Sequence, residues 1–557
     1  MIELIAVALL AARLQGPPPP PPPPSPTRAR DVAPEKKGTA VIKGQVTSID
    51  GRPLRRAQIA LRGSELPYGR TTSTGLEGEY EIREVPAGRY TISVNRGGYL
   101  PSQYGQKRQG EQGIPFDVAN GATLDRINVS MERAGVISGR ILDEAGEPVA
   151  GAAIYTMQSQ FFRGRRQLVP ANMGGGMRTD DTGMYRISPL APGEYLVLAT
   201  FRETWVADDK DKQTLGYAPS YYPGTTSVAA AQRVKVVAGQ EATAIDFSLV
   251  PGRAASITGT VMTADGAPLA AANVAVTQEV TGPGGSSMSM IANTRAGADG
   301  TFTIRDVSPG QYILRAAGPE SDRGAQTASM NLTVTGADIE GLILGTDPGG
   351  LITGRVVTDT GAPLPAPPPT VTVSSATFER SNVPVLPAED GKVGPDGRFQ
   401  RRSASGPAFV RIAGLPSGWA LKSVAMGGQD VTTAPIELRA GQTLSDVTVV
   451  VSNGLPVLTG QVTDANGRPA DRPVLLFPAD RARWHEAADT VRTARADQSG
   501  TFRFERVRPG EYLIVAIDQM ATWQQYDPEF LAPLRDRSTK ITVADEPVTM
   551  DLKVVVR

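Results

Sequence analysis

The chain of 557 residues contains no cysteine and only one histidine, His485. The absence of cysteine excludes disulfides, thiolate nucleophiles, iron–sulfur clusters and thiolate zinc sites. One histidine cannot assemble a His-rich metal cluster, and a Ser-His-Asp triad would have to use that single imidazole. Composition therefore argues against most hydrolytic and redox chemistry. We expect a protein that is not an enzyme, with no catalytic residues, no metal site and no cofactor.

The chain also has no excess of charge of either sign. Lys and Arg together number 57, and Asp and Glu together number 57. Proteins that bind nucleic acid usually carry a basic surface. The balance therefore predicts that nucleic acid is not a partner.

Long apolar runs are missing, and the longest one near the amino terminus covers residues 4–12 (LIAVALLAA). This run is about half of the ~20 residues that a membrane-spanning helix needs, so we expect no transmembrane span. Its length suits a signal peptide over residues 1–16, although Glu3 stands where a basic residue is usual. We therefore expect an exported protein that is periplasmic, secreted or at the cell surface.

Residues 17–39 form a proline-rich linker that begins with eight consecutive prolines, Pro17–Pro24. Proline lacks a backbone donor and favours the polyproline II conformation, which rises ~3.1 Å per residue. Eight such residues form a stiff spacer of roughly 25 Å. The linker is typical of a stalk that holds a folded body away from a surface.

A pattern of glycine and proline occurs five times in the chain. Each copy opens with a glycine in a β-rich run, has a second glycine seven residues later, and has a proline two residues after that. A Gly-x-Pro turn fits this spacing, because glycine accepts a positive φ angle and proline ends a strand ladder. The triplets are Gly44, Gly51 and Pro53; Gly139, Gly146 and Pro148; Gly259, Gly266 and Pro268; Gly354, Gly361 and Pro363; and Gly460, Gly467 and Pro469.

Each copy continues with two aromatic residues that are ten positions apart, and a third glycine lies two residues before the first of them. Alternating apolar residues follow each aromatic residue, which predicts two strands. The short Pro/Gly connection between these strands predicts a β-hairpin. The aromatic pairs are Tyr80 and Tyr90, Tyr185 and Tyr195, Phe302 and Tyr312, Phe399 and Phe409, and Phe502 and Tyr512.

Every copy closes with another alternating strand, and about seven strands in ~100 residues predict a small antiparallel sandwich. The predicted fold is all-β, a tandem array of five sandwiches. We call the predicted ranges copies one to five; they cover residues 40–134, 135–252, 253–348, 349–452 and 453–557. One short helix is expected near 528–535, where Asp527 would cap the helix and Pro528 would occupy its first position.

These motifs resemble the carboxypeptidase regulatory-like domain, and copy two is the best match with GRILDEAGEPVAGAAI followed by DDTGMYRISPLAPGEYLVLA. The resemblance implies a transthyretin-like sandwich, which is grouped with carbohydrate-binding-like folds. It does not imply peptidase activity, because the chain lacks the zinc-binding residues of the peptidase domain that this module accompanies in metallocarboxypeptidases.

Aromatic residues outside the repeated pattern are the best signal for a ligand. Copy two carries Trp205, Tyr217, Tyr221 and Tyr222. Exposed rings bind the apolar faces of sugars, and tyrosine adds a hydroxyl group. Rings in such connections also pack over the ends of sandwiches, and this alternative remains open. We expect a non-catalytic binding protein whose partner is an extracellular polysaccharide or another surface protein. The alternative is a structural spacer with no small ligand.

Three other candidate sites have a simpler interpretation. His485 lies in an insertion with no nucleophile motif nearby, so we expect an exposed loop residue. Lys43 is a candidate for an isopeptide bond to Asn128, but strand alternation predicts that Lys43 points outward. The acidic groups Asp180-Asp181 and Asp208-Asp209-x-Asp211 lack the spacing of an EF-hand calcium loop. Asp181 occupies a turn position, and residues 208–212 alternate in charge as a solvated loop does.

Overall fold

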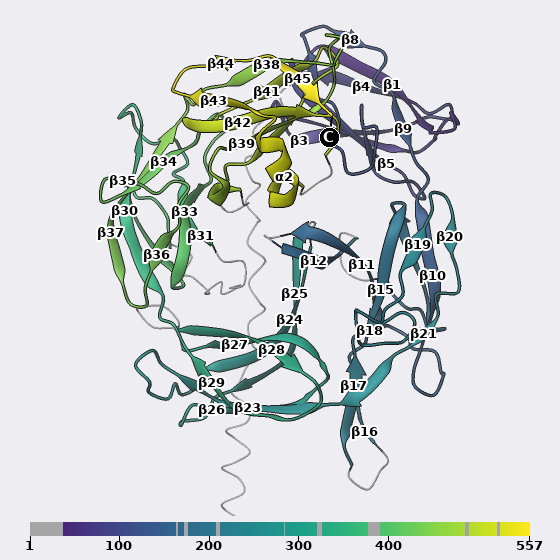
Figure 1. The fold of residues 1–557 in the computed structure, drawn as a ribbon, viewed down its shortest axis with the longest axis vertical. Helices are drawn as coiled ribbons and strands as arrows, with labels where there is room; N and C mark the ends of the chain where they lie inside the picture. Colours follow the sequence, from purple (N-terminus) through teal and green to yellow (C-terminus); the bar gives the residue numbers. More distant parts are fainter. Residues whose placement is uncertain are drawn as a thin grey trace, which may run out of the picture. The chain divides into compact units, whose positions relative to one another are not determined.

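The computed structural model describes residues 37–162, 165–171, 177–207, 212–282, 285–319, 326–376, 390–484, 489–520 and 524–556. The residues from Gly38 onward form one compact unit. Strands dominate throughout the described chain (Figure 1), which confirms the nearly all-β class predicted from the sequence. None of the helices in the described ranges has the length and apolar character that crossing a bilayer requires.

Copy one contains two sheets. One has the order β4-β1-β8, with β9 also paired to β1, and the other has the order β3-β2-β5-β6, with β7 also paired to β5. The strands are β1 (Ala40–Ser48), β2 (Gln58–Gly63), β3 (Leu66–Ser73), β4 (Glu79–Val85), β5 (Gly88–Asn95), β6 (Ser102–Gln103), β7 (Phe116–Val118), β8 (Thr123–Leu124) and β9 (Val129–Met131).

Copy two repeats this plan with the sheets β14-β10-β20 and β12-β11-β15-β18 and adds a third sheet, β16-β17-β22. Its strands are β10 (Gly135–Leu142), β11 (Ala153–Phe162), β12 (Arg165–Pro170), β13 (Met177–Arg178), β14 (Met184–Leu190), β15 (Gly193–Thr200), β16 (Thr204–Val206), β17 (Thr214–Ala218), β18 (Ser220–Tyr221), β19 (Val234–Val236), β20 (Glu241–Ala242), β21 (Phe247–Ser248) and β22 (Val250–Arg253).

Copies three and four also have two sheets each, β26-β23-β29 with β25-β24-β27-β28, and β32-β30-β37-β34-β35 with β31-β33-β36. The strands of copy three are β23 (Ala255–Met262), β24 (Asn273–Gly282), β25 (Gly285–Arg295), β26 (Thr301–Val307), β27 (Gly310–Ala317), β28 (Thr327–Val334) and β29 (Ile339–Gly345). Those of copy four are β30 (Gly350–Thr358), β31 (Thr370–Ser375), β32 (Arg398–Ser403), β33 (Gly406–Ala413), β34 (Ala420–Met426), β35 (Gln429–Asp430), β36 (Ile436–Leu438) and β37 (Thr443–Ser452).

In copy five the strands that correspond to two separate sheets in the other copies are hydrogen-bonded into one sheet, with the order β40-β39-β42-β45-β38-β41. Helix α2 lies at the residues predicted for it, and Asp527 Oδ1 accepts a hydrogen bond from the Glu529 N–H as its cap. The elements are β38 (Leu458–Thr463), β39 (Pro473–Pro478), η2 (Arg481–Arg483), β40 (Arg492–Arg495), β41 (Thr501–Phe504), β42 (Gly510–Ile517), η4 (Gln524–Tyr526), α2 (Pro528–Arg535), β43 (Thr539–Val543), β44 (Val548–Thr549) and β45 (Leu552–Val555).

The predicted β-hairpin is wrong. Strands β4 and β5 follow each other along the chain but lie in different sheets, because β4 pairs with β1 and β5 pairs with β2. In copy five β41 and β42 do not pair with each other either, although both belong to its single sheet. In copies two, three and four the corresponding strands lie in different sheets, as in copy one, and β14 and β15 are one example. The Pro/Gly connection therefore crosses from one sheet to the facing sheet, because the apolar faces of both strands are buried on opposite sides of one core.

The prediction of a purely antiparallel sandwich also needs correction. The opening strand pairs in parallel with the closing strand, as β1 does with β9 and β30 does with β37. The corresponding strands of copies two, three and five are parallel as well. Parallel pairing lets the chain enter a copy at one end of this strand pair and leave at the other. A tandem repeat needs this geometry, and an alternating pattern cannot reveal it because both pairings have the same period.

The opening glycines are required by a close approach of the closing segment. A Cβ atom at Gly44 would lie 2.1 Å from the Ile127 carbonyl oxygen, and one at Gly460 would lie 1.7 Å from that of Met550. The corresponding distances at Gly139, Gly259 and Gly354 are 2.2, 2.4 and 1.8 Å. No side chain fits at these positions unless the backbone moves. The second glycines have a different role, because Gly51 has a φ angle of 82° and open space around it.

The second aromatic residue of copies one, two, three and five is buried in the core and braces the crossing. In copy four the expected counterpart, Phe409, is buried on the other face of β33 from the core residue Val410. The Tyr90 hydroxyl donates to the Pro86 carbonyl oxygen at 2.9 Å, and the hydroxyls of Tyr195, Tyr312 and Tyr512 likewise donate to the carbonyl four residues earlier. Burial disfavours the charged tyrosinate, so it raises the pKa of Tyr195 and of Tyr312 to about 12. These rings therefore belong to the core.

The hydrophobic cores follow the sequence copies. The cluster of copy one contains residues between Ala40 and Met131, and that of copy two contains residues between Ile137 and Leu249. The clusters of copies three, four and five likewise stay within their own ranges. The equal intervals in the sequence therefore correspond to separate cores. The exact domain boundaries stay a prediction.

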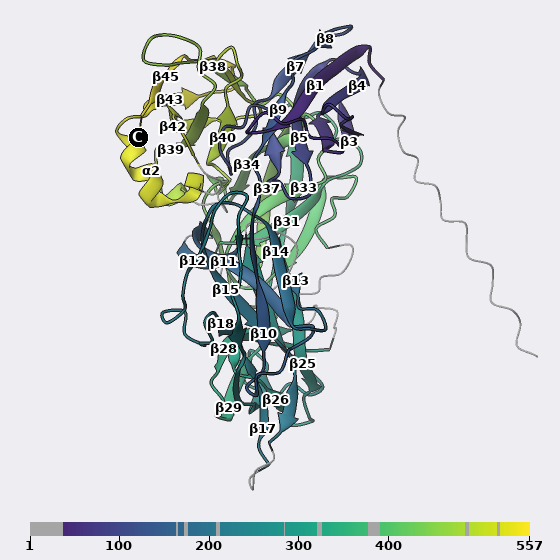
Figure 2. The ribbon, with the colours of Figure 1, turned by 90° about the vertical axis from the view of Figure 1, so that its right-hand side faces the viewer.

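Copy five has an additional core on the outer face of its sheet. Helix α2 lies beside β39 and β42 (Figures 1 and 2), and Phe530, Leu531 and Leu534 pack on this face. Trp484 is buried there too, and its indole N–H donates to the Pro478 carbonyl oxygen at 2.8 Å. Because both faces of β39 are covered, its sequence PVLLFP is apolar throughout.

A buried ion-pair network connects residues of copy one to residues of copy five. The guanidinium group of Arg495 is 4% exposed and lies 3.4 Å from the Glu111 carboxylate and 3.6 Å from that of Asp471. It also donates to the Gln112 carbonyl oxygen at 2.6 Å. Lys107 forms a further ion pair with Asp471 at 3.0 Å. These residues are more than 360 positions apart in the sequence, so no local pattern predicts the contact.

Candidate functional site

A groove with a volume of about 1130 Å³ lies over one sheet of copy two. Its floor is the outer face of β11 and β15. The side chains of Ile154 and Val197 belong to the core, whereas their neighbours Tyr155 and Leu198 line the groove. Strand alternation therefore produces a core on one side of this sheet and a binding surface on the other.

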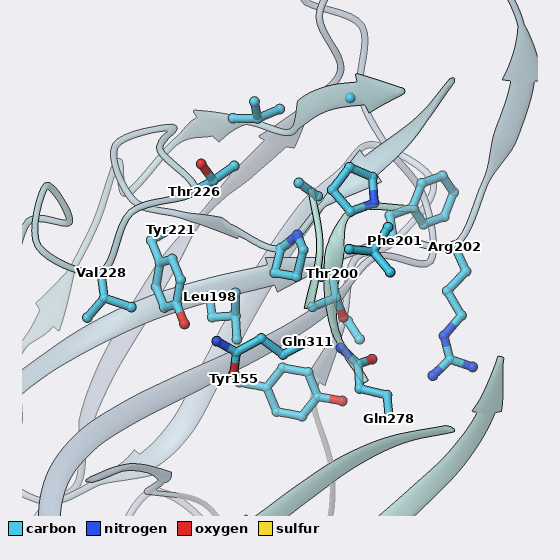
Figure 3. Close-up of a pocket in the computed structure, with 18 of the residues that line it drawn as sticks. Tyr155, Leu198, Thr200, Phe201, Arg202, Tyr221, Thr226, Val228, Gln278 and Gln311 are labelled. Atoms are coloured by element: carbon cyan, nitrogen blue, oxygen red, sulfur yellow. The ribbon is translucent and has the colours of Figure 1, made fainter. Parts of the chain in front are cut away.

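Two tyrosines stand on this floor, as Figure 3 shows. Tyr221 on β18 is paired in register with Leu198 on β15, so both side chains lie on the groove face. Tyr155 on β11 is paired with the same Leu198 from the other side. Leu198 therefore lies between the two rings. Burial disfavours the charged tyrosinate and raises the pKa of Tyr221.

Amide and guanidinium groups complete the groove. Gln278 on β24 and Gln311 next to the start of β27 reach the groove from copy three, near Tyr155 in Figure 3. Arg202 follows β15 and lines the same groove. An apolar floor with a few donors and acceptors at its edge suits a neutral polar ligand with a flat apolar face.

Of the four aromatic residues predicted to bind ligand, Tyr221 lies in the groove. Trp205 and Tyr217 pack against each other with ring centroids 4.7 Å apart, on the core of copy two. Tyr217 is 8% exposed, and its hydroxyl donates to Glu144 Oε2 at 2.6 Å. Burial, followed by this contact with Glu144, raises the pKa of Tyr217 well above its usual value.

Tyr222 lies on the other side of the chain from Tyr221. Its ring packs edge-on against Phe247 at a centroid distance of 6.0 Å and belongs to the edge of the core of copy two. The contacts of Trp205, Tyr217 and Tyr222 are those expected from the packing alternative. A role of these three residues in ligand binding stays a prediction.

Sequence reasoning missed Tyr155, Gln278 and Gln311. Tyr155 lies in a strand whose residues alternate between the core and the outer face. The local sequence does not show whether an outward aromatic residue of this strand lines a groove or lies on open surface. The two glutamines belong to copy three, and only the tertiary structure brings them to copy two. An outward tyrosine within AIYTM, next to the buried Ile154, was the one available signal.

The other sequence candidates have structural roles or lie elsewhere. Lys43 is exposed, as alternation predicted, and Asn128 Oδ1 accepts a hydrogen bond from the Gln45 N–H at 2.9 Å. Asp180 Oδ1 accepts from the Thr182 and Met184 N–H groups, so it caps a turn. His485 and residues 208–211 lie outside the described residues. Within the described ranges, no cluster of three acidic or histidine residues is arranged to hold a metal ion.

Comparison with known proteins gives little functional information. A search of curated proteins finds no match. Among solved structures, a streptococcal ancillary pilin shares 13% identity, with 56% of this chain and 99% of the pilin covered and a TM-score of 0.20. The full-length RrgB pilus protein of Streptococcus pneumoniae shares 9% identity, with 92% and 94% covered and a TM-score of 0.15. The TIE protein of Bacillus anthracis shares 12% identity, with 73% of each chain covered and a TM-score of 0.15.

The comparison with protein families is more specific. Residues 41–132 and 256–342 both match the carboxypeptidase regulatory-like domain. These ranges correspond to copies one and three, and they contain the glycine that faces a carbonyl oxygen and the crossing between sheets. The chain is therefore a repeat protein that carries the carboxypeptidase regulatory-like domain.

Proposed function

We propose that this chain is a non-catalytic, exported array of five β-sandwich modules that binds an extracellular polysaccharide through the groove of copy two. The observation that carries the proposal is the pair of rings, Tyr155 and Tyr221, on the floor of that groove. The apolar run at residues 4–12 and the polyproline stretch support export and a stalk.

The chemistry of the groove favours a sugar over a fully apolar ligand. Tyrosine rings offer flat apolar faces that stack on the C–H face of a pyranose, and their hydroxyls add hydrogen bonds. Gln278 and Gln311 supply both donors and acceptors, as sugar hydroxyls require. The volume exceeds what one monosaccharide fills, so an oligosaccharide segment suits it best.

The alternative function is a structural spacer at the cell surface with no small ligand. The parallel pairing of first and last strands favours it, because this pairing lets modules follow one another along the chain. A spacer needs rigid modules but no aromatic rings that contact a ligand. The effect of replacing Tyr155 or Tyr221 on ligand binding therefore distinguishes the two functions.

A glycan array followed by titration calorimetry on the full chain tests the proposal. We expect a neutral oligosaccharide to bind, and we expect Tyr221→Ala and Tyr155→Ala to weaken its affinity roughly tenfold each, since a stacked ring contributes about 1 kcal/mol or more. Tyr68→Ala is the matched control, because Tyr68 is 77% exposed and lies in copy one. Absence of binding by the parent protein, or equal losses in all three variants, would leave the spacer as the function.

A further inference from the structure

A second pocket, of about 440 Å³, is lined by residues of copies four and five, and its wall contains an unusual number of arginines. Four of them line it: Arg411 on β33, Arg492 on β40, and Arg506 and Arg508 in the crossing between β41 and β42. Their acidic neighbours in the same wall are Asp489 and Glu505. The cluster therefore has an excess of positive charge.

The acidic neighbours do not neutralise this cluster. Asp489 is paired with Arg508, and Glu505 is paired with Arg503 at 3.1 Å. Neither Arg492 nor Arg506 forms an ion pair with a described residue, and each donates instead to a backbone carbonyl: Arg492 to that of Arg506 at 3.1 Å, and Arg506 to that of Trp419 at 3.5 Å.

Burial makes this charge costly. The Arg508 side chain is 15% exposed, and its Nη1 atom is buried without a hydrogen-bond partner among the described residues. Burial lowers the pKa of Arg411 to about 10 and also lowers that of Arg492. The neighbouring Arg508 acts in the same direction on both, whereas Asp489 partly opposes the shift of both. An uncompensated buried guanidinium group destabilises a protein unless an anion pairs with it.

The other copies show that the fold does not need these arginines. Counted from the first aromatic residue of each copy, the position of Arg506 is Glu84, Pro189, Asp306 and Ser403 elsewhere, and the position of Arg508 is Pro86, Ala191, Ser308 and Ser405. None of these eight residues is basic. The same crossing is therefore built without positive charge in copies one to four, so the crossing itself does not require the two arginines of copy five.

We propose that this pocket binds a carboxylate group of an acidic saccharide. Guanidinium groups bind planar carboxylates with two parallel hydrogen bonds. Trp419, Leu415 and Ile412 form an apolar part of the wall, against which a pyranose ring packs. The volume is larger than a free carboxylate needs and is sufficient for one or two sugar rings. This site is separate from the groove of copy two and does not depend on it.

Titration calorimetry of the full chain with a trimer of galacturonic acid tests this site. Galactotriose is the uncharged counterpart, and acetate represents a free carboxylate. We expect the acidic trimer to bind more tightly than either, with an affinity that falls as salt rises. The double substitution Arg506→Gln/Arg508→Gln should weaken the binding of the trimer at least tenfold, because charge-assisted hydrogen bonds are lost.

Matched variants keep the result interpretable. Arg468→Gln removes an exposed arginine of copy five outside the pocket and should change the affinity less than twofold. If the double variant fails to fold, Arg506→Lys keeps the charge, loses the planar fork and should still weaken binding. Tyr221→Ala should leave trimer binding intact, which separates this site from the groove. Equal binding of galactotriose or acetate, no binding of the trimer, or unchanged affinity in the arginine variants would overturn the proposal.

Discussion

Copies one and four solve the same packing problem with different residues. Copy one uses two tyrosines, whose hydroxyls donate to the Ile127 and Pro86 carbonyl oxygens. Copy four has Phe399 in its core, with no hydroxyl to donate. Phe409 is buried too, but it alternates along β33 with Val410, which belongs to the core, and therefore lies on the other face of its sheet. Both copies still place their two strands in facing sheets. The first ring is therefore common to both cores, whereas the second ring and the hydroxyl bonds are not.

The opening strand likewise has one feature that copies one and four share and one in which they differ. Gly44 and Gly354 both face a carbonyl oxygen of the closing segment at a distance that excludes a side chain. The length of the ladder differs, since β30 pairs with β37 from Leu351 to Thr358, whereas β1 has shorter pairings with β8 and β9. The comparison indicates that the glycine gap and the first buried ring, Tyr80 in copy one and Phe399 in copy four, define the module.

The largest expected effect comes from removing the ring. Tyr512→Ala and Phe399→Ala should each lower the free energy of local unfolding by ~3–5 kcal/mol, because both leave a cavity in a buried core. Hydrogen exchange measured by mass spectrometry on the full chain reports this free energy segment by segment. A shift below roughly 0.5 kcal/mol in either copy would show that its ring is not part of the core.

The glycine gap should have the next largest effect. A methyl group in Gly354→Ala would lie 1.8 Å from the Val447 carbonyl oxygen, so the closing strand must move, at a cost of about 3 kcal/mol. The control is Gly361→Ala, which has open space but a φ angle of 74° and should cost about 1 kcal/mol. Thermal unfolding of both variants checks the order. Equal losses of thermal stability in the two variants would mean that the backbone φ angle determines the cost of the substitution and that the close approach to the carbonyl oxygen does not.

The hydroxyl bond should have the smallest effect. Tyr90→Phe removes the bond to the Pro86 carbonyl oxygen and keeps the ring, so copy one should lose about 1 kcal/mol of stability. Tyr68→Phe, on an exposed residue of the same copy, should change nothing measurable. Denaturation with urea compares the two. If Tyr90→Phe lowered the stability as much as Tyr512→Ala does, this would contradict the interpretation that the module does not need the hydroxyl bond, which copy four lacks.

The local elements were predictable because their causes are local. Asp527, Pro528 and Glu529 mark the start of α2 within three residues, and the structure begins the helix there. The outward position of Lys43 follows from the period of its strand. The partner of each strand was not predictable in this way, and the hairpin expected between residues 79–85 and 88–95 became a crossing between sheets.

The candidate sites show the same limit. Tyr221 was named from its ring alone, whereas its neighbour Tyr155 is an outward residue on a strand that the pattern does not single out. Arg495 looks like any polar residue in RTAR, yet its ion pairs reach Glu111 in copy one. That guanidinium group is buried by residues that lie far away in the sequence.

The sequence by itself determined that one β-rich module is repeated, where its turns lie and which rings enter its cores, Phe409 excepted, because period, positive φ angles and side-chain volume act within a few residues. The tertiary structure alone decided which strands pair, in which direction, and which side chains line the groove over copy two and the arginine pocket of copies four and five. Hydrogen-bond partners and buried charges are shared between distant segments, so their geometry exists only after the chain has folded.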